Sequence, residues 1–170
     1  NVKDMEWLRK AESNLTRFIH TFEGMATKSA EDEDILLMAL SYRANALAEL
    51  FAKTKNEGYA KNSVKDMLAI IKRSTNIDFI NTLYLSVMEA DLEGEIAQKI
   101  LPLNKERIRH SLLIGEIDEA LKQAIFLKIL LNQNKDAIIF CDALFEYAKN
   151  GKSQRNVIDF EDPDYMFLAQ

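Results

Sequence analysis

The chain has 170 residues, of which 48% are apolar and 29% are charged, a balance typical of a folded globular domain and not of a disordered segment. Its formal net charge of -5 argues against nonspecific binding to nucleic acid, which usually needs a net positive field. The single cysteine, Cys141, cannot form an internal disulfide, and no apolar stretch reaches the roughly 20 residues of a membrane span. We therefore expect a cytoplasmic protein with no membrane segment.

Apolar residues recur at three- and four-residue spacing along the chain, and only five glycines and two prolines interrupt them. This pattern predicts helices, because Gly and Pro are the strongest breakers and the 3.6-residue period is the main helix signal. Seven helices are expected, over residues 3–25, 30–55, 63–73, 77–101, 105–114, 116–131 and 135–149. Short connections predict antiparallel neighbours, so the expected fold is all-α: a bundle of about six or seven antiparallel helices. The helical domain is expected over residues 1–151, with a C-terminal extension over residues 152–170.

Capping residues mark several of the predicted helix starts. Residues 29–32, Ser-Ala-Glu-Asp, match a capping box, in which a hydroxyl residue is followed three positions later by an acid. The same pattern at Ser63 predicts the start of the third helix, and Asn76 or Asp78 is expected to cap the fourth.

Two later positions are predicted to separate the helices that follow. Pro102 is expected to end the fourth helix, because proline lacks a backbone N–H, and Asn104 is expected to cap the fifth. Residues 115–121 resemble the start of the second helix of a tetratricopeptide repeat, in which Gly ends one helix and Ala packs closely against it. This resemblance implies a helical hairpin that turns at Gly115.

Arg43 interrupts the apolar stripe of the second predicted helix, between Leu40 and Leu47. A charge on an apolar face needs a partner or access to water. We expect Arg43 either to snorkel or pair with an acid of another helix, or to line a groove that receives an acidic partner, and we include it among the candidate partner-binding residues.

Two acidic clusters support an alternative function, that of a divalent-metal-dependent enzyme or a nucleotide-binding protein. Glu89 and Glu93 lie four residues apart on one predicted helix, with Glu31 or Asp34 as further oxygen ligands. The simpler interpretation is a solvated face for the first pair and helix-dipole partners for the second. No phosphate loop, zinc spacing or catalytic constellation accompanies them, so no catalytic residue, metal or cofactor is predicted.

A third hypothesis is nucleic-acid binding through Lys105, Arg107 and Arg109, which surround His110. The acidic net charge and the absence of interleaved aromatic residues argue against it.

The extension over residues 152–170 combines a polar linker with acids and large apolar residues, and it has no helical period. Such a segment is expected either to fold back on its own bundle or to dock on a partner. The candidate partner-binding residues in it are Phe160, Asp162, Tyr165, Phe167 and Leu168.

The leading hypothesis is therefore a non-enzymatic protein–protein interaction module, such as an adaptor, a chaperone-like protein or a regulatory subunit. Its expected partner is another protein. A homo-oligomer also stays open, because an apolar stripe can face its own core or a second subunit.

Overall fold

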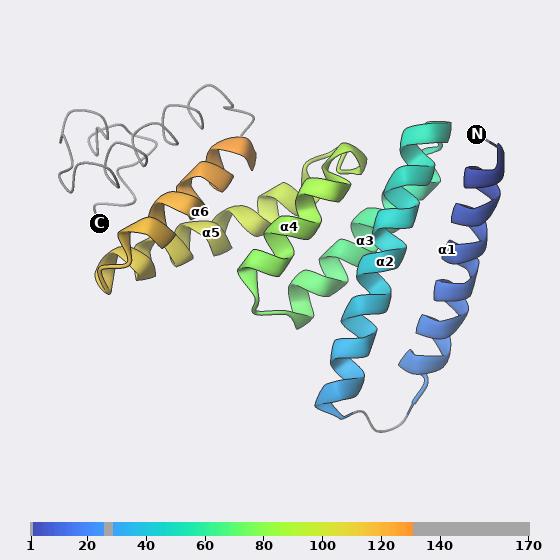
Figure 1. The fold of residues 1–170 in the computed structure, drawn as a ribbon, viewed down its shortest axis with the longest axis horizontal. Coiled ribbons are helices and arrows are strands. Elements are labelled where there is room, and N and C mark those ends of the chain that lie inside the picture. The colour runs from blue at the N-terminus through green and yellow to red at the C-terminus, as the bar shows by residue number, and fades with distance from the viewer. Residues whose placement is uncertain (1, 26–28, 131–170) are drawn as a thin grey trace. The chain divides into compact units, whose positions relative to one another are not determined.

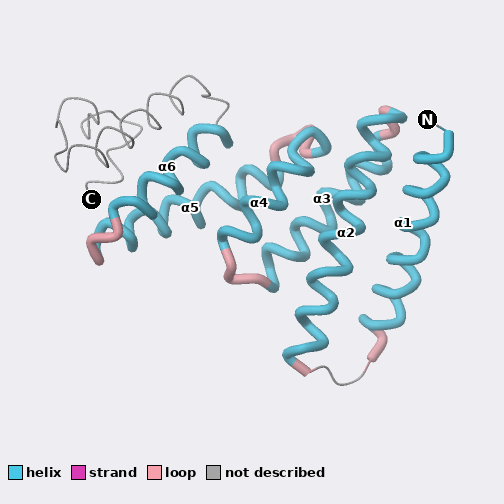
Figure 2. Tube along the Cα trace, in the orientation of Figure 1, coloured by secondary structure: helices cyan, strands magenta, loops and turns pink. Residues whose placement is uncertain are grey.

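The computed structural model describes residues 2–25 and 29–130, and there the chain forms six α-helices and one short 3-10 helix without any strand (Figures 1 and 2). The elements are α1 (Val2–Glu23), α2 (Ala30–Thr54), α3 (Glu57–Arg73), α4 (Ile77–Val87), η1 (Met88–Ala90), α5 (Glu95–Leu113) and α6 (Ile117–Leu130). The all-α prediction is confirmed. The predicted helix over 135–149, Cys141 and the extension over 152–170 lie outside the described residues.

Contacts between Cα atoms divide the chain into two compact units, Asn1–Ile100 and Leu101–Gln170. The first unit is built around α2, which packs against α1, α3 and α4. Its fully buried side chains include Leu36, Leu50, Met67 and Ile80, contributed by α2, α3 and α4. In the second unit, Ile108 of α5 packs with a stripe of apolar residues on α6.

The long helix α2 begins where the capping pattern predicts. The Ser29 hydroxyl accepts a hydrogen bond from the backbone N–H of Asp32, and the Asp32 carboxylate accepts one from the backbone N–H of Ser29. These reciprocal bonds satisfy donors that a helix start leaves without partners, and they hold the pKa of Asp32 below its ordinary value.

By length and composition, α2 is also long and apolar enough to cross a membrane. No such stretch was expected from the sequence. In this structure 56% of its most apolar window is buried. A core helix covered by its neighbours has the same character, because a helix that is apolar on most sides must be covered.

The predicted start of the third helix at Ser63 is wrong. α3 begins six residues earlier, at Glu57, where the Asn56 side chain accepts a hydrogen bond from the backbone N–H of Gly58. Ser63 instead lies buried inside α3 and donates a hydrogen bond of 2.9 Å to the carbonyl oxygen of Ala44 in α2. Its hydroxyl therefore joins two helices and does not start one.

The predicted long helix over 77–101 is also wrong, although its N-cap at Asn76 is confirmed. The chain leaves α4 after Val87, passes through η1 and turns at Gly94, whose φ of 69° is the left-handed conformation that glycine adopts easily. Pro102 does not end a helix but lies inside α5, and Asn104, predicted to be a cap, is buried within the same helix.

The hairpin predicted at Gly115 is confirmed. Gly115 has φ of 80°, and the backbone N–H of Glu116 donates to the carbonyl oxygen of Ser111 over 2.8 Å. This bond closes the end of α5 in the manner of a Schellman motif, and α6 follows immediately.

Candidate functional site

Arg43 forms a bidentate ion pair with Asp66 of α3. Its Nη2 donates to Asp66 Oδ1 over 2.6 Å and its Nε donates to Oδ2 over 2.7 Å. The side chain of Asp66 is 3% exposed and that of Arg43 is 17% exposed. The prediction that Arg43 pairs with an acid of another helix is therefore confirmed, and a contact between Arg43 and a partner protein stays a prediction.

The pair continues into α1 through Thr16. Arg43 Nη1 donates to the Thr16 hydroxyl over 3.1 Å, and this hydroxyl donates to Glu12 over 2.9 Å. Burial raises the pKa of the Asp66 carboxyl above its ordinary value, and the hydrogen bonds from Arg43 oppose that rise. A cavity of about 270 Å³ borders this network. Glu12, Thr16, Arg43 and Asp66 already bond one another, so we interpret the network as a link between α1, α2 and α3.

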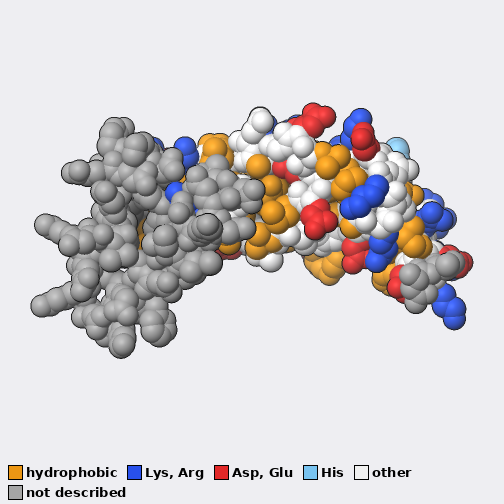
Figure 3. Space-filling model, turned by 90° about the horizontal axis from the view of Figure 1, so that it is seen from above, with side chains coloured by type: hydrophobic (Ala, Val, Ile, Leu, Met, Phe, Trp, Pro, Cys, Tyr) orange, Lys and Arg blue, Asp and Glu red, His pale blue; other side chains and the backbone are white. Residues whose placement is uncertain are grey.

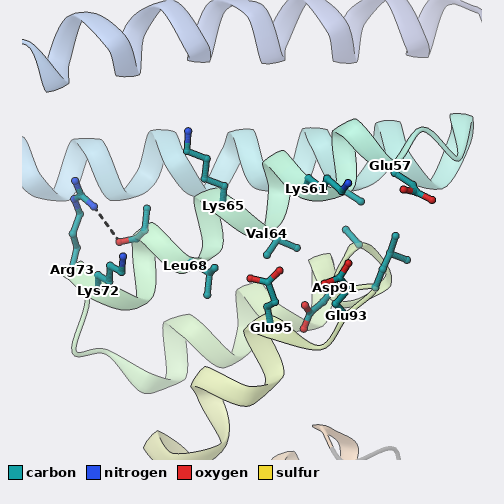
Figure 4. A pocket seen from close by; sticks show the side chains of 14 residues that line it. Glu57, Lys61, Val64, Lys65, Leu68, Lys72, Arg73, Asp91, Glu93 and Glu95 are labelled. Atoms are coloured by element: carbon teal, nitrogen blue, oxygen red, sulfur yellow. Dashed lines mark hydrogen bonds between the residues drawn. The ribbon is translucent and has the colours of Figure 1, made fainter.

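A groove of about 740 Å³ lies between α3 and the segment 90–95, and we call it the α3 groove (Figure 4). Its floor is apolar. Ala60, Val64 and Leu68 lie on one face of α3 at four-residue spacing, and Leu92 lines the groove from the turn after η1. This volume falls within the range of roughly 300–1,000 Å³ that is typical of binding pockets.

Charged side chains stand along both sides of the α3 groove (Figure 4). Lys61, Lys65 and Lys72 come from α3, and Glu93 and Glu95 come from the turn and the start of α5. All five are exposed, and none has an ion pair with another residue that the structure describes. These charges are therefore available to a ligand.

Asp91 fixes the shape of the acidic side of the groove. Its carboxylate accepts hydrogen bonds from the backbone N–H groups of Ile96 and Ala97 over 3.1 and 3.0 Å, and so caps α5. The same carboxylate accepts a hydrogen bond from the hydroxyl of Tyr84 in α4. Burial and this carboxylate together raise the pKa of Tyr84 to about 12. The turn at 91–94 is thus attached both to α4 and to α5.

Further large apolar side chains are exposed elsewhere on the first unit. Ile35, Met38 and Tyr42 follow one another at three- and four-residue spacing on the outer face of α2, and Trp7 is exposed on α1. In the space-filling view, hydrophobic side chains remain visible among the charged ones (Figure 3). None of these four residues lines the α3 groove.

The carboxylates predicted as an alternative metal site do not share a helix face. Glu89 lies in η1 and Glu93 in the turn that follows, because α4 ends before both. Glu31 and Asp34 are in the first turn of α2, whose cap uses Asp32. Across residues 2–25 and 29–130, no group of three or more His, Cys, Asp or Glu side chains could hold a metal ion.

The predicted basic patch is in part engaged within the second unit. Arg107 Nε lies 3.8 Å from a carboxylate oxygen of Glu119, and Arg109 donates a hydrogen bond of 3.1 Å to Glu106. Phe160, Asp162, Tyr165, Phe167 and Leu168 lie outside the described residues, so their predicted contact with a partner stays a prediction.

The groove is the feature that interpretation of the sequence missed. Residues 89–95 were expected to lie on one predicted helix with a solvated acidic face. Gly94 was the residue that could have indicated a turn here, because a glycine inside an acidic helical stretch marks a break in the helix.

Comparison with protein-family models, with curated proteins and with solved structures gave no match for this chain.

Proposed function

We propose that this chain is a protein–protein interaction module that holds a segment of a partner protein in the α3 groove. The observation that carries the proposal is an apolar floor flanked by five exposed charged residues that have no ion pair with any other residue the structure describes. An apolar floor supplies binding free energy, and charges beside it supply specificity and speed association. The adaptor, chaperone-like or regulatory roles expected from the sequence are all forms of such an interaction.

A matched pair of substitutions tests this proposal. Leu92 lines the groove and is 56% exposed, whereas Met38 lies on the α2 face and is 53% exposed. Because the exposures are nearly equal, Leu92→Gln and Met38→Gln should have similar small effects on folding. Loss of one apolar anchor from an interface costs about 1.5–3 kcal/mol, or roughly tenfold or more in affinity.

The experiment is capture of partners from native lysate by the full chain, followed by mass spectrometry, with wild type and both variants compared. We expect a protein that wild type and Met38→Gln retain and Leu92→Gln loses. A partner lost only by Met38→Gln would move the binding surface to the α2 face. If no protein is captured by wild type, the interaction proposal fails.

A further inference from the structure

The two ends of the α3 groove carry opposite charge, and this inference about its ligand rests on the proposed function. At the end where α3 starts, the three acids Glu57, Asp91 and Glu93 outnumber a single cation, Lys61, while Lys65 and Glu95 lie between the two ends. At the end where α3 finishes, the lining charges are Lys72 and Arg73; Figure 4 shows the guanidinium of Arg73 turned toward α2, and it donates a hydrogen bond to the carbonyl oxygen of Ala69.

The basic end is only weakly neutralised by the rest of the unit. Arg73 lies 4.0 Å from Glu23 and 3.8 Å from Glu33, which are long distances for exposed ion pairs and contribute little. Lys72 has no ion pair with any other described residue. A ligand with acidic groups at this end would therefore meet Lys72 first, with the partly engaged guanidinium of Arg73 beside it.

The length and floor of the groove match a helix. Sixteen residue steps separate Glu57 from Arg73, which is about 24 Å at about 1.5 Å per residue. Ala60, Val64 and Leu68 form a straight apolar stripe over eight of these steps, about 12 Å in the middle of α3, and such a stripe accepts the apolar face of a second helix.

We propose that the α3 groove binds an amphipathic helix of a partner protein, antiparallel to α3, with acids in its N-terminal half and bases in its C-terminal half. The acids then lie beside Lys72 and Arg73, and the bases lie beside Glu57 and Glu93. The order of charge follows from the helix dipole, because acids stabilise a helix N-terminus and bases a C-terminus. A parallel helix would need the reverse order, against its own dipole.

A display library tests the charge order directly. Its members are helices of about 18 residues with a fixed apolar stripe and flanking positions that are randomised between Glu and Lys. The baits are the wild-type chain, the double variant Lys72→Glu/Arg73→Glu and the control Arg9→Glu/Lys10→Glu. The control changes the same net charge at an exposed Arg-Lys pair on α1.

We expect wild type and the control to enrich Glu in the N-terminal half and Lys in the C-terminal half. The groove variant should lose the preference for Glu in the N-terminal half. Among selected helices, the acid-first peptide should bind at least about tenfold more tightly than its charge-reversed isomer at low salt, and the difference should shrink as salt rises. A base-first preference, an absent preference or the same preference in the groove variant overturns the proposal.

Two further results separate this proposal from its alternatives. If lysate capture yields a partner that depends on Leu92 while the library shows no charge order, the interaction function stands and the proposed helix is wrong. A further bait carries Phe160→Ala and Phe167→Ala in the C-terminal segment. If this bait selects helices and wild type selects none, the chain's own C-terminal segment occupies the groove, and the proposal of a partner helix is overturned.

Discussion

Removal of Arg43 should destabilise the first unit strongly, because it leaves Asp66 charged and buried without its partner. The Asp66 side chain is 3% exposed and receives two hydrogen bonds from Arg43, at 2.6 and 2.7 Å. Breaking a buried ion pair by deleting one member costs about 3–5 kcal/mol. We therefore expect Arg43→Met, which keeps the length of the side chain, to lower the free energy of unfolding by about that amount.

Substitution of the other member of the pair, Asp66, should lower the free energy of unfolding by less. In Asp66→Asn the guanidinium keeps its hydrogen bond to Thr16 and is 17% exposed, so water can reach it. We expect a loss of about 1–2 kcal/mol, typical of a weakened charged hydrogen bond. The double variant Arg43→Met/Asp66→Asn should be more stable than Arg43→Met alone, because it holds no buried charge.

Urea unfolding of the full chain, followed by circular dichroism, measures all four proteins of this cycle. Acid adds a second readout. Burial raises the pKa of Asp66 and Arg43 opposes that rise, so the pKa of Asp66 should be higher in Arg43→Met than in wild type. A carboxyl whose pKa is raised by folding contributes stability at low pH that is lost as pH rises through the raised pKa, and this loss is larger in the variant. The deficit of Arg43→Met against wild type should therefore be largest at neutral pH and smaller in acid. A double variant as unstable as Arg43→Met, or a deficit that grows in acid, would refute this reasoning.

Three further predictions concern the turn and the helix beside the groove. Tyr84 has its pKa raised to about 12, so its contribution to stability is present below the unfolded value of about 10 and is lost between pH 10 and about 12. The free energy of unfolding of wild type should fall by up to about 3 kcal/mol in that range, and Tyr84→Phe should lack this fall. Equal losses in the two proteins would contradict this role of Tyr84. Asp91→Ala removes the acceptor for the N–H groups of Ile96 and Ala97 and should cost about 1–2 kcal/mol in urea unfolding, whereas an unchanged midpoint would exclude a capping role. Pro102→Ala should raise the thermal midpoint by restoring a backbone donor inside α5, and a lower midpoint would show that the proline is needed there.

Local sequence predicted the features that depend on local bonds. The capping box at Ser29, the cap at Asn76 and the left-handed turn at Gly115 each rest on hydrogen bonds between residues at most five positions apart. Ser63 shows the limit of this approach, since its hydroxyl has the composition of a cap but bonds Ala44, nineteen residues away. A local pattern cannot show that a distant carbonyl competes for the same hydroxyl.

The groove shows the same limit for a site. Its α3 side could be read from the spacing of Ala60, Val64 and Leu68, but the other side depends on where the chain turns back. That turn requires Gly94 in a left-handed conformation and the Asp91 carboxylate on the start of α5. The acidic side of the groove therefore exists only because the predicted long helix is broken.

The sequence by itself determined that this protein is helical and where most of its helices begin, because apolar period and capping act within one or two turns of the chain. Only the tertiary structure decided that Asp66 is the partner of Arg43 and that Glu95 faces Val64 and Leu68 across a groove. Those pairings join residues more than twenty positions apart, and contacts at such separation depend on how whole helices pack and not on any local preference.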